Sequence, residues 1–382
     1  MSRILVLGCG NIGAFMAKDL AEHMPSTDIV IADKFLTRAK EVATTIGKEN
    51  VTAIQLDVRN YNELVKTIKR FDLVVGALPG KFGYRSMKAT IDANVDMVDI
   101  SSMPEDPLTL NEDAVKAGVT IIPYCGAAPG LTNILVGHAV SKLDEVENVH
   151  IMVGGLPAEP VPPLGYIVTW SIEDLIADYV SPAKIVENGR IVEVDALSGL
   201  EEVEFPGVGK LEAFYTDGLT TLLYTIKPVK SMWEKTLRYP GHAEKIKLLR
   251  ELGFFDEQPI NIDDVNVSPR KVTAKLLEKK LRRPEIRDIF IMKVEVSGVK
   301  ENSKICYVYQ LLDRYKDGVT AMARTTGYPT SIIAQLVAQK VIKEKGVIPP
   351  EKLGAKEEIF EKILAELENR QVKIVESVLR QP

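Results

Sequence analysis

The chain has 382 residues, more than one hydrophobic core usually supports, so we expect two domains. Hydrophobic residues make up 46% of the sequence and charged residues 26%, a composition that excludes a disordered or fibrous protein. The formal net charge is −5, with 48 basic and 53 acidic residues, so we expect neither a nucleic-acid nor a membrane partner. The strongest basic run, residues 270–287, favours a solvated helix face over a binding patch.

The cysteines Cys9, Cys125 and Cys306 do not have the spacing of a metal site or of a disulfide framework. We therefore expect no bound metal. The first residues lead into a strand-like run and do not resemble a signal peptide. No apolar stretch reaches the ~20 residues that span a bilayer. These features predict a soluble, cytoplasmic protein.

Residues 1–125 alternate short, almost wholly apolar runs with segments of helical periodicity, such as Ile12, Met16 and Leu20. This alternation predicts an α/β fold with a parallel, doubly wound Rossmann sheet. The expected strands are Ile4–Leu7, Ile29–Ala32, Val51–Leu56, Leu73–Gly76, Met97–Ile100 and Thr120–Pro123.

From about residue 145 the pattern changes to hairpin-like strands rich in Gly and Pro, which predicts an α+β domain on a mixed sheet. The expected strands are Val146–Gly154, Val192–Val194, Glu202–Phe205, Leu211–Tyr215, Phe290–Val296 and Lys304–Gln310, and the expected helices are Ile172–Tyr179, Gly218–Thr225 and His242–Leu252. A helical stretch begins at Thr320, and we expect it to return to the first domain. The predicted division is residues 1–140 plus 320–382 for cofactor, and 141–319 for substrate and dimerisation.

The glycine loop is the most informative motif. Residues 8–13 read G-x-G-x-x-G directly after a strand and open a helix. This arrangement lets the backbone approach a pyrophosphate at a helix N-terminus. The predicted cofactor-binding residues of this loop are Gly8, Gly10, Asn11, Ile12 and Gly13.

Asp33 ends the second expected strand, 20 residues after Gly13, where the ribose-binding carboxylate of such domains lies. A carboxylate would repel the 2′-phosphate of NADP by about 4 kcal/mol at ~4 Å and an effective dielectric near 20. Lys34 and Arg38 offset part of this repulsion. We therefore expect NAD as the cofactor, with NADP less favoured.

Further cofactor contacts are expected at the carboxyl ends of the other strands, because ligands of open α/β sheets bind there. For Asp57 and Ser101 an ordinary loop role is the alternative. The predicted residues are Asp57, Val58, Ala77, Leu78, Pro79, Asp99, Ser101, Gly126 and Pro129.

Several blocks of the sequence resemble the saccharopine dehydrogenase superfamily, and they cover essentially the whole chain. They are GCGNIG, GALPG at 76–80, VDIS at 98–101, CGAAPGLTNIL at 125–135, TWSIEDLIADYVSPAKIVENGR at 169–190, TLRYPGH at 236–242 and GVIPPEKLG at 346–354. Within the superfamily the chain is most similar to the archaeal L-lysine 6-dehydrogenases. The resemblance implies NAD-dependent oxidation of the side-chain amine of L-lysine to a cyclising semialdehyde, release of ammonia, and a homodimer.

One segment departs from the saccharopine-type pattern. Residues 215–218 read Tyr-Thr-Asp-Gly where that pattern has an arginine. Saccharopine carries three carboxylates and requires cationic partners. The departure therefore favours a smaller, less anionic substrate such as lysine.

The remaining candidates concern the substrate, and each has a structural alternative. His242 and Asp106 are candidate bases, the alternatives being a helix cap and a turn carboxylate. Arg238 is a candidate clamp for the substrate carboxylate or a member of an ion pair. We expect the remaining candidates to line the substrate site: Trp170, Ser171, Asp217 and, as a packed thiol, Cys125.

Two other functions stay open. One is a saccharopine or carboxynorspermidine-type dehydrogenase that acts on a secondary amine. The other is a non-catalytic NAD-binding regulator. The second-domain motifs argue against the regulator, because a sensor does not require them.

Overall fold

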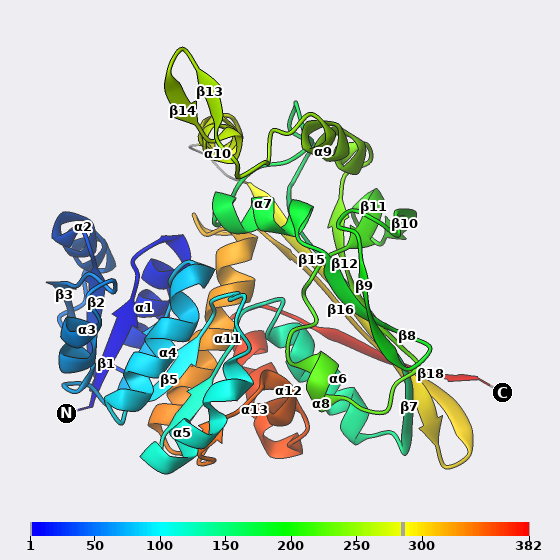
Figure 1. Cartoon of the computed structure of the whole chain (residues 1–382). Coiled ribbons are helices and arrows are strands. Elements are labelled where there is room, and N and C mark those ends of the chain that lie inside the picture. Colours follow the sequence, from blue (N-terminus) through cyan, green and yellow to red (C-terminus); the bar gives the residue numbers. More distant parts are fainter. Residues whose placement is uncertain (1, 284–286, 382) are drawn as a thin grey trace. The chain divides into compact units, whose positions relative to one another are not determined.

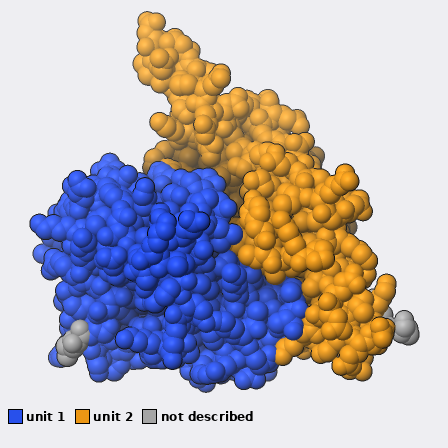
Figure 2. Space-filling view, turned by 60° about the horizontal axis from the view of Figure 1, so that its bottom comes forward, with its two compact units in different colours: residues 1–141, 323–373 blue, residues 142–322, 374–382 orange. Residues whose placement is uncertain are grey.

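The structure is a computed structural model of the chain and describes residues 2–283 and 287–381 (Figure 1). The chain forms two compact units, coloured separately in Figure 2. Unit 1 comprises residues 1–141 and 323–373, and unit 2 comprises residues 142–322 and 374–382.

Unit 1 is built on a seven-stranded sheet with the order β17-β6-β5-β4-β1-β2-β3, in which every pairing is parallel. The central strands are buried because their apolar runs are covered on both faces, as in Ile4–Leu7. The strands are β1 (Arg3–Leu7), β2 (Asp28–Asp33), β3 (Val51–Gln55), β4 (Leu73–Gly76), β5 (Asp96–Asp99), β6 (Thr120–Ile122) and β17 (Gly346–Val347). The predicted doubly wound Rossmann sheet is confirmed.

Helices cover this sheet. They are α1 (Asn11–His23), α2 (Leu36–Ile46), α3 (Tyr61–Ile68), α4 (Gly83–Asp92), α5 (Asn111–Ala117), α6 (Leu131–Ser141), α11 (Ala321–Ala338), α12 (Pro350–Gly354) and α13 (Glu357–Asn369), with 3-10 turns η1 (Gly80–Phe82) and η2 (Pro107–Leu110). A buried ion pair ties the returning segment to α1, since Arg370 Nε lies 2.9 Å from Asp19 Oδ1.

Unit 2 is built on a nine-stranded mixed sheet with the order β10-β11-β12-β7-β15-β16-β18, and β8 and β9 pair beside β12. β12 and β7 are parallel, whereas their other neighbours are antiparallel, as predicted for a mixed sheet. The strands are β7 (Glu145–Pro157), β8 (Ala183–Glu187), β9 (Arg190–Val194), β10 (Glu201–Phe205), β11 (Gly209–Tyr215), β12 (Ser231–Arg238), β15 (Asp288–Lys300), β16 (Ser303–Arg314) and β18 (Val375–Gln381).

The helices of unit 2 are α7 (Ile172–Val180), α8 (Leu222–Thr225), α9 (His242–Glu251) and α10 (Pro269–Leu281). A separate hairpin, β13 (Ile260–Ile262) and β14 (Val265–Val267), projects beside α10 (Figure 1). Most of α10 lies within the basic run, residues 270–287, as the predicted helix face requires, and residues 284–286 of the run lie outside the described residues.

Three expectations require correction. Residues 375–381 were assigned to the first domain, but β18 pairs with β16 in the sheet of unit 2. The helix expected over Gly218–Thr225 is reduced to Leu222–Thr225, because the preceding residues form an irregular turn. Residues 231–238, for which no strand was expected, form a central strand.

Candidate active site

The glycine loop follows β1, at the point where the strand order of the unit 1 sheet reverses between β4 and β2. A Cβ on Gly8 would lie 2.5 Å from the Ala77 carbonyl oxygen, and one on Gly13 would lie 2.1 Å from that of Gly8. Only glycine fits at these two positions. Gly10 has no atom within 4 Å of the corresponding point, so its backbone is open to a close ligand. The loop, which includes Asn11 and Ile12 at the start of α1, therefore fits a pyrophosphate.

Asp33 lies at the carboxyl end of β2, beside this loop. Its Oδ2 accepts from the backbone N–H of Cys9 at 3.4 Å and from the thiol of Cys9 at 3.2 Å. Its Oδ1 accepts from the N–H of Phe35 at 2.9 Å. These contacts hold the carboxylate next to the pyrophosphate loop, which is the position that binding of an adenosine ribose requires.

Asp57 and Val58 follow β3. The Asp57 carboxylate binds the guanidinium of Arg59, with Oδ2 lying 2.5 Å from Nη2. This ion pair lowers the pKa of Asp57 to about 2. The Val58 carbonyl accepts from Arg85 at 3.4 Å. Asp57 thus has the loop role that was the alternative, although it stays at the edge of the sheet where the adenine is expected.

The ends of β4 and β5 meet through Ser101, whose hydroxyl donates to the Leu78 carbonyl at 3.1 Å. Ala77 packs against the glycine loop, and Pro79 is exposed beside it. Asp99 was predicted to contact the cofactor, but it is completely buried and its Oδ1 accepts from the Ser101 N–H at 2.7 Å. We therefore correct its role to support of this turn.

Cys125, Gly126 and Pro129 follow β6. Cys125 is fully buried, which raises the pKa of its thiol and agrees with a packed side chain rather than a nucleophile. Its backbone N–H donates to the Asp99 carbonyl at 2.7 Å, which joins the ends of β5 and β6. The Gly126 carbonyl accepts from the N–H of Leu131 at the start of α6. Pro129 is partly exposed.

Asp106 does not have the environment of a base. It is exposed, and its Oδ1 accepts from the N–H of Leu108 at 2.9 Å as the cap of η2. Asp106 therefore has the alternative role that the sequence left open, a carboxylate that stabilises a turn.

In unit 2, Arg238 ends β12 and is 3% exposed. Its guanidinium lies 4.6 Å from the ring centroid of Tyr166, a cation–π contact. Its Nη1 donates to the Leu237 carbonyl at 2.9 Å. The buried cation stays a candidate for holding a carboxylate.

His242 was a candidate base, and the structure contradicts that role. Its Nδ1 lies 2.9 Å from the Leu164 carbonyl, which can only accept, so this nitrogen carries the proton. Its Nε2 lies 2.8 Å from the hydroxyl of Tyr179. Burial and the neighbouring Arg238 lower the pKa of His242 to about 3. His242 is therefore a neutral structural residue at neutral pH.

Trp170 and Ser171 precede α7. The indole of Trp170 is partly buried and donates to the Tyr166 hydroxyl at 3.0 Å. Trp170 thus packs beside the ring that contacts Arg238 and can line a substrate site. Ser171 caps α7 by accepting from the Asp174 N–H, and a contact of its hydroxyl with substrate stays a prediction.

Two carboxyl groups of this region, Asp178 and Glu234, were not predicted. Asp178 interacts with Arg238, and Glu234 interacts with Asp178 and Asp217. Asp217, the predicted member, is exposed and accepts from the Lys184 N–H at 3.2 Å. Glu234 on β12 is buried, and Asp178 on α7 is half-buried. Predicting a strand over 231–238 would have identified Glu234 as a site candidate, because such a strand places Glu234 and Arg238 on the same face.

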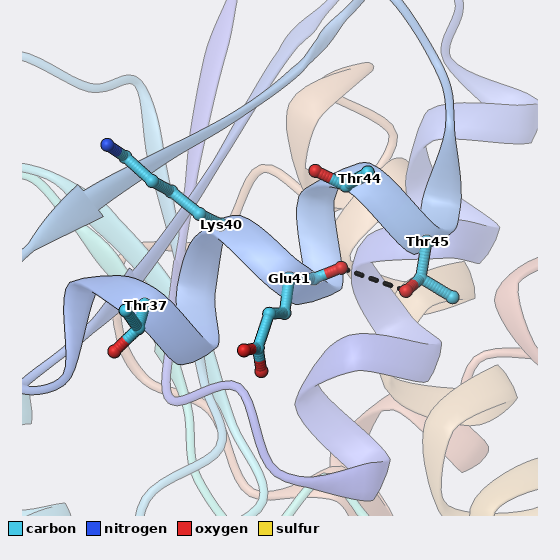
Figure 3. Close-up of a pocket in the computed structure, with 5 residues that line it drawn as sticks. All are labelled: Thr37, Lys40, Glu41, Thr44 and Thr45. Carbon is cyan, nitrogen blue, oxygen red and sulfur yellow. Dashed lines mark hydrogen bonds between the residues drawn. The ribbon is translucent and has the colours of Figure 1, made fainter.

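Figure 3 shows a shallow hollow on the surface of α2. A single helix lines it, and it contains no predicted site residue, so we assign it no function.

Within residues 2–283 and 287–381 no group of His, Cys, Asp or Glu side chains is arranged for a metal ion. In the same ranges no helix combines the length and apolar character that crossing a bilayer demands.

A parallel sheet with this glycine loop, followed by a mixed-sheet unit, defines a dinucleotide-binding protein of two domains. Residues 4–122 match the saccharopine dehydrogenase NADP binding domain, and residues 126–372 match the saccharopine dehydrogenase C-terminal domain. The chain belongs to the saccharopine dehydrogenase family. The predicted family is thereby confirmed.

Individual relatives agree with this membership. The chain is 29% identical over 276 residues to saccharopine dehydrogenase (NADP+, L-glutamate-forming) of Schizosaccharomyces pombe, which covers 67% of this chain but 59% of that relative. It is 23% identical over 382 residues to the carboxyaminopropylagmatine dehydrogenase of Synechocystis, covering 92% and 93% of the two chains. Apo saccharopine dehydrogenase (L-Glu forming) of Saccharomyces cerevisiae superposes with a TM-score of 0.79 at 22% identity, covering 99% of this chain and 100% of that one, which supports the fold.

Proposed function

We propose that the protein oxidises the side-chain amine of L-lysine with NAD. In this reaction the carbon that bears the amine loses a hydride to NAD, and the resulting imine is hydrolysed by water. The products are the semialdehyde, which cyclises to a piperideine carboxylate, together with NADH, ammonium and a proton. Unit 1 supplies the dinucleotide site, and unit 2 supplies the groups that recognise the amino acid.

The observation that carries the proposal is the buried guanidinium of Arg238, which interacts with the carboxyl group of Asp178. The segment around Asp217 supports it, because saccharopine-type members carry an arginine there and this chain does not. One guanidinium on this face of β12 suits a substrate with one carboxylate better than a tricarboxylate.

The choice of NAD depends on Asp33. Its carboxylate is held beside the glycine loop, where it favours a free ribose 2′-hydroxyl over a phosphate. The family domain is described as NADP binding, and the S. pombe relative uses NADP+. NADP is therefore the competing cofactor in the test.

A second candidate is the oxidation of a secondary amine. The relatives from S. pombe and Synechocystis favour it, since saccharopine and carboxyaminopropylagmatine are both secondary amines. The two candidates differ in what leaves: a primary amine releases ammonia, and a secondary amine releases a second organic amine or a keto acid.

The test is the formation of NADH or NADPH with lysine, ornithine, saccharopine and carboxyaminopropylagmatine, followed by analysis of the products. The proposal expects ammonia to appear one-for-one with NADH when lysine is the substrate. Glutamate or 2-oxoglutarate from a productive substrate, with no turnover of lysine, would replace it with the second candidate.

A further inference from the structure

β12 presents three polar side chains on the same face. Glu234, Thr236 and Arg238 alternate along the strand, so all three point to the same side of the sheet. They are 4%, 7% and 3% exposed. Thr236 is satisfied, because its hydroxyl lies 2.9 Å from that of Thr216. Glu234 and Arg238 differ from Thr236, because each has a side-chain atom without a hydrogen-bond partner among the described residues.

Glu234 Oε2 and Arg238 Nε have no hydrogen-bond partner in the part of the chain that the structure describes. Buried polar atoms without a partner cost free energy and are rare in native proteins. The Glu234 carboxyl also requires Gly218 beside it, since a Cβ there would lie 1.8 Å from Oε1. The fold thus reserves space for a buried, incompletely bonded carboxyl group and guanidinium on the same strand face.

Asp178 connects these two residues electrostatically. Burial raises the pKa of Asp178 to about 7, and the nearby Arg238 lowers it. Burial likewise raises the pKa of Glu234 to about 8, with added contributions from Asp178 and Asp217. Because both Arg238 and Glu234 interact with Asp178, the three residues form a continuous cluster.

The charges around this cluster do not neutralise it. Glu212, which pairs with Arg238 in the strand register, is occupied at the start of α9, where it accepts from the N–H groups of Gly241 and Ala243. At the exposed edge, Lys184 lowers and Glu193 raises the pKa of Asp217, after the larger effect of its burial.

Asp178 therefore interacts with Arg238 on one side and with Glu234 on the other, and Asp217 adds a second negative charge near Glu234. Tyr179 beside the guanidinium adds no charge at pH 7, because burial raises the pKa of its hydroxyl.

We propose that this cluster binds the ammonium group of a substrate through Glu234 and Asp178, and a carboxylate of the same substrate through Arg238. The ligand class is a cationic amino acid with more ammonium than carboxylate groups. Lysine has two ammonium groups and one carboxylate, whereas saccharopine has three carboxylates. The cluster selects the first and repels the second. This inference rests on the proposed function and assigns its substrate specificity to Glu234.

The decisive experiment is calorimetric binding of L-lysine and of saccharopine to the full chain with NADH present, so that no oxidation occurs. The variants are Glu234→Gln and, as a matched control on the exposed strand β10, Glu204→Gln. We expect Glu234→Gln to weaken lysine binding at least about tenfold, because a charge-assisted hydrogen bond is lost. Glu204→Gln should bind like the unmodified protein, and the preference over saccharopine should narrow only in Glu234→Gln.

A second readout separates binding from a structural role. At pH 7 a carboxyl group with a pKa of about 8 is mostly protonated, so an ammonium ligand should displace about one proton from Glu234. Titrations in buffers of different ionisation enthalpy measure this release, which Glu234→Gln should abolish. Should that variant not fold, Asp178→Asn takes its place, with a smaller proton release expected. Unchanged lysine affinity and proton release in the folded variant would overturn the inference.

The outcome also separates this inference from the proposed function. Glu234-dependent binding of lysine without any NADH formation would retain the site and refute the activity. Lysine oxidation with an unchanged KM in Glu234→Gln would retain the activity and refute the site.

Discussion

The hydroxyl of Tyr179 on α7 donates a hydrogen bond of 2.8 Å to Nε2 of His242, the first residue of α9. Because Nδ1 of the same ring donates to the Leu164 carbonyl, both nitrogens are used and the imidazole is neutral. The side chain is 1% exposed. This arrangement joins two helices of unit 2, and the following prediction concerns its pH dependence.

His242 should make the stability of unit 2 fall in acid. Its pKa is about 3 in the folded protein and near 6.5 when unfolded, so the unfolded chain takes up a proton first. The contribution is complete above pH 6.5 and is lost as the pH falls toward 3, at about 1.4 kcal/mol per pH unit. Urea unfolding at pH 7 and pH 5 measures it, with His242→Asn as the comparison. An equal loss in the variant would show that other groups dominate the acid sensitivity.

The rate of lysine oxidation should rise from pH 7 to an optimum near 9 to 10. Only an unprotonated amine has the lone pair that forms the imine, and at pH 7 about one lysine side chain in 2,500 is unprotonated. Since His242 and Asp106 are structural, His242→Asn and Asp106→Asn should keep the shape of the profile of kcat/KM. A flat profile between pH 6 and 8 would contradict the free-amine argument, and a shifted limb in one variant would return that residue to the chemistry.

Gly10→Ala should lose affinity for NADH, whereas Gly13→Ala should lose stability. A Cβ on Gly13 would meet the Gly8 carbonyl at 2.1 Å, so this variant should lose several kcal/mol of stability. A Cβ on Gly10 meets no atom within 4 Å, so that variant should fold normally and lose affinity for NADH at least about tenfold. Thermal unfolding and fluorescence titration with NADH measure the two effects. Normal NADH binding by Gly10→Ala would place the pyrophosphate elsewhere.

Asp33→Ala should narrow or reverse the preference between NAD and NADP. The unmodified protein is expected to use NAD at least about tenfold better, because the carboxylate repels a 2′-phosphate. The ratio of kcat/KM for the two cofactors measures the effect, and Lys34→Ala is the control for the neighbouring cation. Equal use of both cofactors by the unmodified protein would instead implicate Lys34 or Arg38.

The sequence alone determined the parts of this protein that depend on neighbouring residues. The strand, the turn at Gly8 and the start of α1 lie within a short segment, so the spacing of glycines predicts both the fold of the loop and its ligand. Asp33 is found by the same reasoning because a single helix separates β1 from β2.

Only the tertiary structure decided the composition of the site in unit 2. Glu234 and Arg238 come from a strand whose mixed sequence, SMWEKTLR, lacks the alternation that predicts strands, since charged residues here are buried. Asp178 reaches them from a helix more than 50 positions earlier in the chain. β18 likewise joins the second sheet by pairing with β16, which no local pattern indicates. Burial and pairing between distant segments set the pKa of Glu234 and made His242 a structural residue, and neither property is written in the residues beside them.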